Sequence, residues 1–208
     1  MGIIGIYNYT IILTFIGVAS AITGMTFALS GHPARAILCL LICGVCDMFD
    51  GKVARTRKRT RFEESYGIQL DSLCDVVCFG VLPAIIGYSI GLSKWYCIPI
   101  LVFYVLAAIT RLAFFNVQEE LRKAEGKSVK RTYYTGLPVT NSAIIFAFVY
   151  GLRLIIGESI YLVVYAVALI LVALAFIAKV RVVKVGPRGL AVLFAIGVVE
   201  LILMLCLK

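Results

Sequence analysis

The fold is decided by an apolar stretch that runs directly into acidic residues. Residues 34–54 read ARAILCLLICGVCDMFDGKVA, and apart from Arg35 the stretch is uncharged until Asp47. A run of about 20 predominantly apolar residues is the length that an α-helix needs to cross a bilayer. We therefore predict a membrane-spanning helix whose last turns carry Asp47 and Asp50.

Similar stretches follow one another along the chain. Of its 208 residues, 62% are hydrophobic and 15% are charged, whereas a soluble domain carries about 25% charged residues. Stretches of spanning length cover residues 10–30, 34–54, 68–90, 95–116, 138–156, 158–179 and 189–207. The first has no basic segment before it and no cleavage site after it, which favours a retained helix. We predict one all-α, polytopic membrane domain over residues 1–208, with about seven transmembrane helices and no soluble domain.

The net charge is +9, and the basic residues are concentrated in alternate connections between the predicted helices. Sixteen of the 20 Lys and Arg lie in or beside residues 52–61, 111–131 and 179–188, and the other four mark the alternate connections and the C-terminus. This alternation predicts a cell-membrane protein with its N-terminus in the cytoplasm and its C-terminus outside. Attraction to anionic lipid headgroups explains the rest of the charge, so nucleic acid is not a predicted partner.

Three smaller expectations follow. The polar segment 118–134 could form an interfacial helix on the cytoplasmic face. Small residues would let the first helix approach its neighbours closely, namely Gly17, Ala19, Ala21 and Gly24. The seven cysteines are expected to be buried apolar fillers, because a thiolate metal site would lie in lipid without a histidine nearby.

All aspartates of the chain lie within residues 47–75. An Asp at the centre of a membrane helix costs about 2.5–3.5 kcal/mol on an insertion scale, so intramembrane acids are functional candidates. By helical geometry, a sector of about 100° on the first of two helices contains Asp47, Asp50, Gly51 and Ala54. A sector of about 80° on the next helix contains Gly67, Asp71 and Asp75. We expect these two faces to converge near the membrane surface.

Several hard carboxylates without His or Cys favour Mg²⁺ or Mn²⁺ as the metal. Glycine and alanine leave room for a bulky ligand, and Arg55 adds a positive charge suited to phosphate. The pattern therefore indicates a metal–pyrophosphate site. One alternative is structural ion pairing of the acids with Lys52, Arg55 or Arg111. A distant alternative is a cation transporter, whose helices should break at mid-membrane, yet neither Gly nor Pro lies beside the acids at that depth.

These residues match a known signature. Asp47-x-x-Asp50-Gly51-x-x-Ala54-Arg55, followed by Gly67-x-x-x-Asp71-x-x-x-Asp75, resembles the signature of the CDP-alcohol phosphotransferases. The eleven residues between Arg55 and Gly67 are a longer spacer than this family usually has. The resemblance implies a six-helix core, here with one further helix, and a homodimer.

The resemblance also implies residue roles. Mg²⁺ or Mn²⁺ would be held by Asp47, Asp50 and Asp71. Asp75 could contact the metal as well. The CDP-lipid would be bound by Asp47, Gly51, Ala54, Arg55 and Gly67. Asp75 would act as the catalytic base on the acceptor hydroxyl.

A finer resemblance concerns the acceptor. Five short motifs look like the phosphatidylserine synthase branch of the family. They are Leu70-Asp71-Ser72-Leu73-Cys74-Asp75, Phe79-Gly80-x-x-Pro83-Ala84, Arg111-Leu112-Ala113, Phe115-Asn116 and Gly136-Leu137-Pro138. Phe114 and Thr140 depart from that pattern. The implied reaction is CDP-diacylglycerol plus L-serine giving phosphatidylserine and CMP, with Arg111 and Asn116 in the acceptor site. Glycerol phosphate or inositol phosphate is the alternative acceptor, for which the basic run at residues 57–61 could supply cations.

Overall fold

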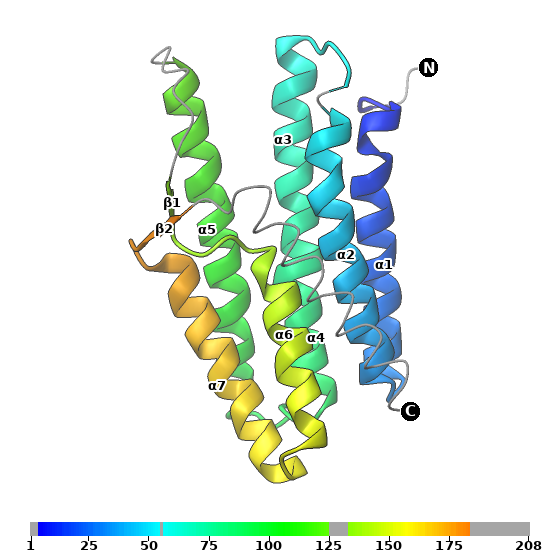
Figure 1. Ribbon diagram of the computed structural model, residues 1–208, viewed down its shortest axis with the longest axis vertical. Helices are drawn as coiled ribbons and strands as arrows, with labels where there is room; N and C mark the ends of the chain where they lie inside the picture. The colour runs from blue at the N-terminus through cyan, green and yellow to red at the C-terminus, as the bar shows by residue number, and fades with distance from the viewer. Residues whose placement is uncertain (1–3, 55, 125–132, 184–208) are drawn as a thin grey trace.

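A computed structural model describes residues 4–54, 56–124 and 133–183. Its long helices run along one common axis as a bundle (Figure 1). The elements in chain order are the 3₁₀ turn η1 (Tyr9–Ile11), α1 (Ile12–Leu29), α2 (Pro33–Ala54), α3 (Arg61–Asp75), the π turn η2 (Val76–Val81), α4 (Leu82–Ser89), α5 (Ile98–Ala124), β1 (Tyr133–Thr135), α6 (Asn141–Gly151), the 3₁₀ turn η3 (Leu152–Leu154), α7 (Glu158–Ile177) and β2 (Arg181–Val183).

The membrane character of the chain is confirmed, but not the number of seven spans. In the described part of the chain, four helical segments are long and apolar enough to cross a membrane: Tyr9–Leu29, Arg61–Ser89, Ile98–Arg122 and Ile160–Ile177. Helix α2 has 22 residues, but its aspartates, Arg35 and Lys52 reduce its apolar character. Helix α6 has only 11 residues, fewer than the predicted stretch 138–156. The predicted span 189–207 lies outside the described residues.

Small residues let α1 and α2 pack closely. Gly17, Ala21 and Gly24 are buried at the helix interface, and a Cβ atom at Gly24 would lie 2.8 Å from the Cβ of Cys39. The prediction is wrong for Ala19, which is exposed. The cysteines behave as expected where described: Cys39, Cys43, Cys46, Cys74 and Cys78 are buried, Cys97 is half-buried, and Cys206 lies outside the described residues.

The helix that carries the second acidic face changes its geometry directly after Asp75. Pro83 lacks an N–H group and crowds the carbonyl four residues earlier, that of Phe79. The chain widens into a π turn here, and the N–H of Leu82 donates to the carbonyl of Val77. Tyr104 donates its hydroxyl to the freed Phe79 carbonyl at 2.7 Å. Arg61–Ser89 stays one helical segment, but a proline eight residues beyond Asp75 changes the helix geometry one turn closer to the acids.

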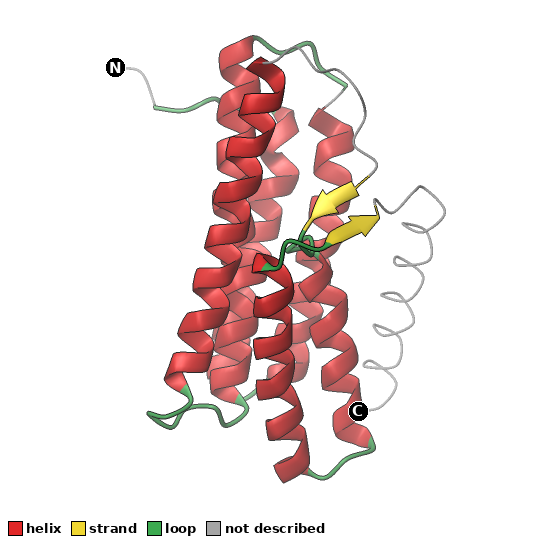
Figure 2. Ribbon diagram, turned by 90° about the vertical axis from the view of Figure 1, so that its left-hand side faces the viewer, coloured by secondary structure: helices red, strands yellow, loops and turns green. Residues whose placement is uncertain are grey.

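A short antiparallel ribbon modifies the all-α prediction. Strands β1 and β2 pair antiparallel, with Tyr134 opposite Val182, and Figure 2 shows them beside the helices. Directly after β1, the N–H of Gly136 donates to the Val180 carbonyl at 2.9 Å, and that of Leu137 donates to the Ala175 carbonyl at 2.9 Å. The ribbon therefore ties the segment before α6 to the end of α7.

The polar segment 118–134 is not a separate interfacial helix where it is described. Residues up to Ala124 are the last turns of α5, and Tyr133–Thr135 form β1. Residues 125–132 lie outside the described part of the chain. The interfacial-helix prediction fails because helical periodicity continues from the apolar part of α5 into the polar part without a terminating Gly or Pro.

An aromatic cluster joins α5, α6 and α7 to the π turn. The ring of Phe146 lies 5.5 Å from that of Tyr104 and 5.2 Å from that of Tyr165, between ring centroids. Tyr165 also donates its hydroxyl to the Pro83 carbonyl at 3.0 Å. Fully buried tyrosines need a partner for the hydroxyl, and here the partners are carbonyls of the irregular segment. The cluster thus fixes the helix that carries Asp71 and Asp75.

Candidate active site

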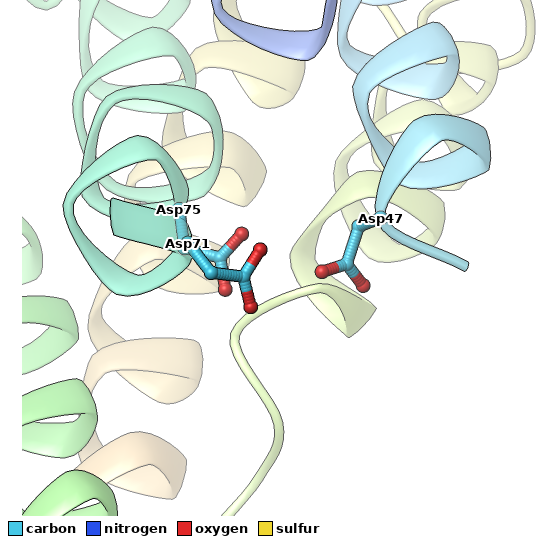
Figure 3. Close-up of side chains that lie close together, drawn as sticks. All are labelled: Asp47, Asp71 and Asp75. Atoms are coloured by element: carbon cyan, nitrogen blue, oxygen red, sulfur yellow. The ribbon is translucent and has the colours of Figure 1, made fainter. Parts of the chain in front are cut away.

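Three aspartates from two helices meet in one place. Asp47 of α2 and Asp71 and Asp75 of α3 each offer a carboxylate oxygen, and these oxygens lie within 4.8 Å of one another. Figure 3 shows the two carboxylates of α3 directed toward Asp47. The convergence of the two acidic faces that helical periodicity predicted is confirmed for these three residues.

Local sequence explains how α3 presents its acids. Thr60 and Glu63 form a capping box, in which the Glu63 N–H donates to Thr60 Oγ1 at 3.2 Å and the Thr60 N–H donates to Glu63 Oε2 at 2.8 Å. Helix α3 therefore begins at Arg61, six residues before Gly67. Part of the long spacer after α2 is helical, so the added length extends α3 and leaves the acidic face facing α2.

Packing against α6 supports the other side of the site. A Cβ atom at Gly44 of α2 would lie 3.2 Å from the Cβ of Ala143 near the start of α6. Gly44 precedes Asp47 by about one helical turn. Helices α6 and α7 lie beside only the lower half of the bundle in Figure 1. The carboxylates therefore lie close to the level at which α6 begins.

Asp50 lies next to the cluster of three, with its side chain in hydrogen-bond contact with that of Asp71. Its side chain is 8% exposed, and it accepts a hydrogen bond from Thr14 Oγ1 of α1 at 3.5 Å. It is within electrostatic reach of Asp71 and Asp47. Sequence reasoning missed Thr14, because a threonine within an apolar stretch gives no signal of its own.

The donor set fits a hard divalent cation. All three clustered residues offer carboxylate oxygen, the ligand that Mg²⁺ and Mn²⁺ prefer. Within the described ranges the salt bridges are Arg57–Glu63 and Arg122–Glu119, and neither includes an aspartate. Lys52 lies 4.9 Å from the centre of the Phe49 ring and belongs to neither of these salt bridges, so the ion-pair alternative is wrong for Lys52; for Arg55 and Arg111 it stays a prediction. Gathered acids are unfavourable at membrane depth unless a cation or water compensates them.

The small residues of the signature lie beside the acids along both helices. Gly51 and Ala54 occupy the last turn of α2, and Gly67 lies on α3 one turn before Asp71. All three are partly exposed. Arg55 lies outside the described residues.

Arg111 of α5 is buried against the segment that precedes α6. It is 6% exposed, its Nε donates to the Leu137 carbonyl at 3.2 Å, and its guanidinium lies 5.2 Å from the centre of the Phe115 ring. The carbonyl that receives it belongs to the segment held by the ribbon. The side chain is thus oriented by residues far from it in the chain.

Asn116 connects α5 to α3. Its Nδ2 donates to Ser72 Oγ at 2.9 Å and to Gln69 Oε1 at 3.4 Å, and Ser72 Oγ lies 3.1 Å from Asn116 Oδ1. Asn116 does not end its helix, because α5 continues to Ala124. Ser72 directly follows Asp71, so this contact supports the acidic face from behind. We missed Ser72 and Gln69, although two polar residues three apart in an apolar stretch were an available signal.

Comparisons with known proteins agree with the geometry. The family model described as CDP-alcohol phosphatidyltransferase matches residues 7–207. The chain is 38% identical over 149 residues to CDP-diacylglycerol–serine O-phosphatidyltransferase of Saccharomyces cerevisiae, covering 69% of this chain and 52% of that protein. It is 27% identical over 195 residues to the Mycobacterium bovis enzyme of the same name, covering 88% and 65%.

A third relative comes from an archaeon. Archaetidylserine synthase of Methanothermobacter thermautotrophicus is 34% identical over 135 residues, covering 64% of this chain and 53% of that protein. The matches to these three relatives span between 52% and 65% of their own lengths. The family match, residues 7–207, includes both acidic helices.

Proposed function

Because the chain belongs to the CDP-alcohol phosphatidyltransferase family, we propose that it transfers a phosphatidyl group from CDP-diacylglycerol to L-serine, giving phosphatidylserine and CMP. The observation that carries the chemistry is the meeting of Asp47, Asp71 and Asp75 within 4.8 Å. The names of the relatives support serine as the acceptor. We do not propose cation transport, since family membership accounts for the acids and the small residues together.

The aspartates are proposed to hold Mg²⁺ or Mn²⁺, with Asp50 as an additional ligand or as a support through Thr14. When bound, the cation supplies positive charge that makes phosphorus more electrophilic and stabilises the departing CMP. Asp47 would also face the donor, together with Gly51, Ala54, Arg55 and Gly67. These roles rest on the carboxylate cluster and on the match to the family signature.

Asp75 is proposed as the general base. It would accept the proton of the serine hydroxyl, whose oxygen forms a bond to the phosphorus that carries diacylglycerol. The pyrophosphate bond from that phosphorus to CMP breaks, and CMP leaves. An alcohol holds its proton too tightly to lose it unaided at neutral pH, which is why a positioned carboxylate is needed. The place of Asp75 beside Asp71, one turn along α3, supports this role.

The acceptor site is proposed to lie on α5. Serine is a zwitterion, so its pocket needs a cation for the carboxylate and oxygen atoms for the ammonium group. Arg111 is a buried cation, and Asn116 is a buried amide next to the helix of the acids. Their burial supports a role beyond surface charge, because buried polar groups are costly unless they have partners.

We also propose the setting of the enzyme. It would be a single multi-pass domain of the cell membrane, with its active site and N-terminus on the cytoplasmic side and its C-terminus outside. The alternation of positive charge supports this orientation. A homodimer is proposed from the family resemblance alone. Cysteine labelling of residues 57–65 from the outside of intact cells would contradict the orientation.

The decisive assay supplies one acceptor at a time. Purified protein in detergent is given CDP-diacylglycerol and Mn²⁺ with L-serine, glycerol 3-phosphate or inositol phosphate, and CMP release is measured. We expect release with serine, and none with serine from an Asp71→Asn variant. Release with a phosphorylated alcohol but not with serine would contradict the acceptor while leaving the family chemistry in place.

A further inference from the structure

The connection between α2 and α3 holds an arginine against the face of α3 that carries the acids. A Cβ atom at Gly67 would lie 3.4 Å from Arg59 Nη1, so the guanidinium lies directly over this glycine. Gly67 precedes Asp71 by four residues, which is about 6 Å along the helix axis. A fixed positive charge therefore lies about one turn from the carboxylate cluster.

The path of this connection is set at both ends. At its start, the Thr56 N–H donates to the Val53 carbonyl at 3.1 Å, and Thr56 Oγ1 lies 3.0 Å from the Tyr9 hydroxyl. At its end, Thr60 and Glu63 form the capping box of α3. Only three residues lie between these anchored threonines. The position of Arg59 therefore follows from the helix ends on each side.

The three basic residues of the connection that the structure describes differ in what they contact. Arg57 makes a salt bridge with Glu63 at 3.0 Å, and Lys58 is exposed. Arg59 is half-buried, and in the described parts of the chain it makes no hydrogen bond or salt bridge. Its positive charge still interacts electrostatically with Glu63. Of the three charges, that of Arg59 is thus the one directed at the acidic face and still able to receive an anion.

We propose that Arg59 binds the CDP part of the donor, as the cation that faces its pyrophosphate from the side of the connecting loop. This inference rests on the proposed function, and it deepens it by adding a donor-binding residue outside the signature. A guanidinium presents planar, paired N–H groups that match phosphate oxygens. The acids and their cation would hold the pyrophosphate from one side, and Arg59 would hold it one helical turn away. The long spacer would then serve to bring this arginine over Gly67.

The test measures binding of soluble CDP, because no acceptor and no lipid is involved. Wild type, Arg59→Gln and the matched control Lys58→Gln are purified in detergent with Mn²⁺, and the Kd for CDP is obtained by titration calorimetry. Loss of a charge-assisted contact should raise the Kd by about tenfold in Arg59→Gln. Removing an exposed charge should change it by less than about twofold in Lys58→Gln. Arg59→Lys, which keeps the charge but not the paired geometry, should lie between them.

Each result decides the proposal. Unchanged CDP binding in Arg59→Gln would overturn it, and so would an equal loss in Lys58→Gln, which would indicate general attraction of anions to the loop. In a further outcome, Arg59→Gln leaves the Kd for CDP unchanged but alters CDP-lipid binding when the vesicles contain anionic lipid. That outcome would assign Arg59 to the bilayer and would also overturn the proposal. The serine proposal fails separately: a wild type that binds CDP but releases no CMP with serine leaves Arg59 as a donor residue.

Discussion

The donor side and the acceptor side of the proposed site are assembled in different ways. The carboxylate cluster comes from α2 and α3, which follow one another in the chain, and Asp47 and Asp75 are 28 residues apart. On the acceptor side, Arg111 is held by Leu137, 26 residues away, and Asn116 by Ser72, 44 residues away. The separations along the chain are thus similar, but the donor side needs only two consecutive helices. The acceptor side also needs α5 to pack on α3 and the Leu137 segment to be held by the ribbon to β2.

This difference predicts how substitutions will act. A change in the donor cluster should affect chemistry with little effect on folding, because few structural contacts use those carboxylates. A change at the ribbon should affect both stability and acceptor affinity, because Leu137 is held through its N–H by the end of α7 and orients Arg111 through its carbonyl. The following predictions test that distinction.

The largest effect is expected at the metal ligands. Asp71→Asn should leave no measurable CMP release, since an amide cannot supply the negative charge that a divalent cation requires. The measurement is turnover with saturating Mn²⁺, together with the thermal unfolding midpoint in detergent, which should stay near that of wild type. We expect the same result for Asp47→Asn and Asp50→Asn. Near-normal turnover in any of them would contradict its assignment as a ligand.

Asp75→Asn should be the next most severe change. Loss of a general base lowers turnover by about 10²- to 10⁴-fold, while the Kd for CDP should rise less than it does in Asp47→Asn. Titration with CDP separates the two roles, because a base acts after the donor has bound. A loss of CDP binding as complete as in Asp47→Asn would identify Asp75 chiefly as a metal ligand.

Gly136→Ala should act on the acceptor side. The residue has a φ of +79°, and a Cβ there would lie 2.6 Å from the Phe176 carbonyl oxygen. The left-handed conformation alone costs about 1–2 kcal/mol for a residue with a Cβ. We expect a lower unfolding free energy and a higher KM for serine, with the KM for CDP-diacylglycerol unchanged.

The matched control for this variant is Gly151→Ala. Among the described residues, and apart from its chain neighbours and its own helix backbone, no atom lies within 4 Å of the position that a Cβ at Gly151 would occupy, so neither KM should change. An equal rise of both KM values in Gly136→Ala would break the proposed separation between the two sides.

The smallest effect is expected at the π turn. Tyr104→Phe removes the 2.7 Å hydrogen bond to the Phe79 carbonyl, while Ser142 Oγ remains 3.5 Å from it. A buried hydrogen bond contributes about 0.5–1.5 kcal/mol, so the unfolding midpoint should fall slightly and turnover should be retained. A large fall in turnover with unchanged stability would mean that the turn positions Asp75 more directly than its packing indicates.

Periodicity was sufficient for the helices and for the donor cluster. The faces that contain Asp47, Asp71 and Asp75 could be predicted because helical spacing is local and the connection between the two helices is short. The extent of α3 was harder to predict, since the capping residues Thr60 and Glu63 lie inside what the sequence presents as a polar run.

The remaining features needed the tertiary structure. Pro83 could end the helix, kink it or be accommodated by a π turn. Which of these occurs depends on which group donates a hydrogen bond to the Phe79 carbonyl, and that donor is Tyr104 on another helix. The ribbon joins two strands of three residues that are almost fifty residues apart, and so short a strand has no alternation to read. The sequence alone determined which residues share a helical face, because 3.6-residue periodicity is a property of the local backbone. Which hydroxyls and carbonyls meet across helices was decided only by packing, because buried polar groups pair with whatever the fold brings within about 3 Å.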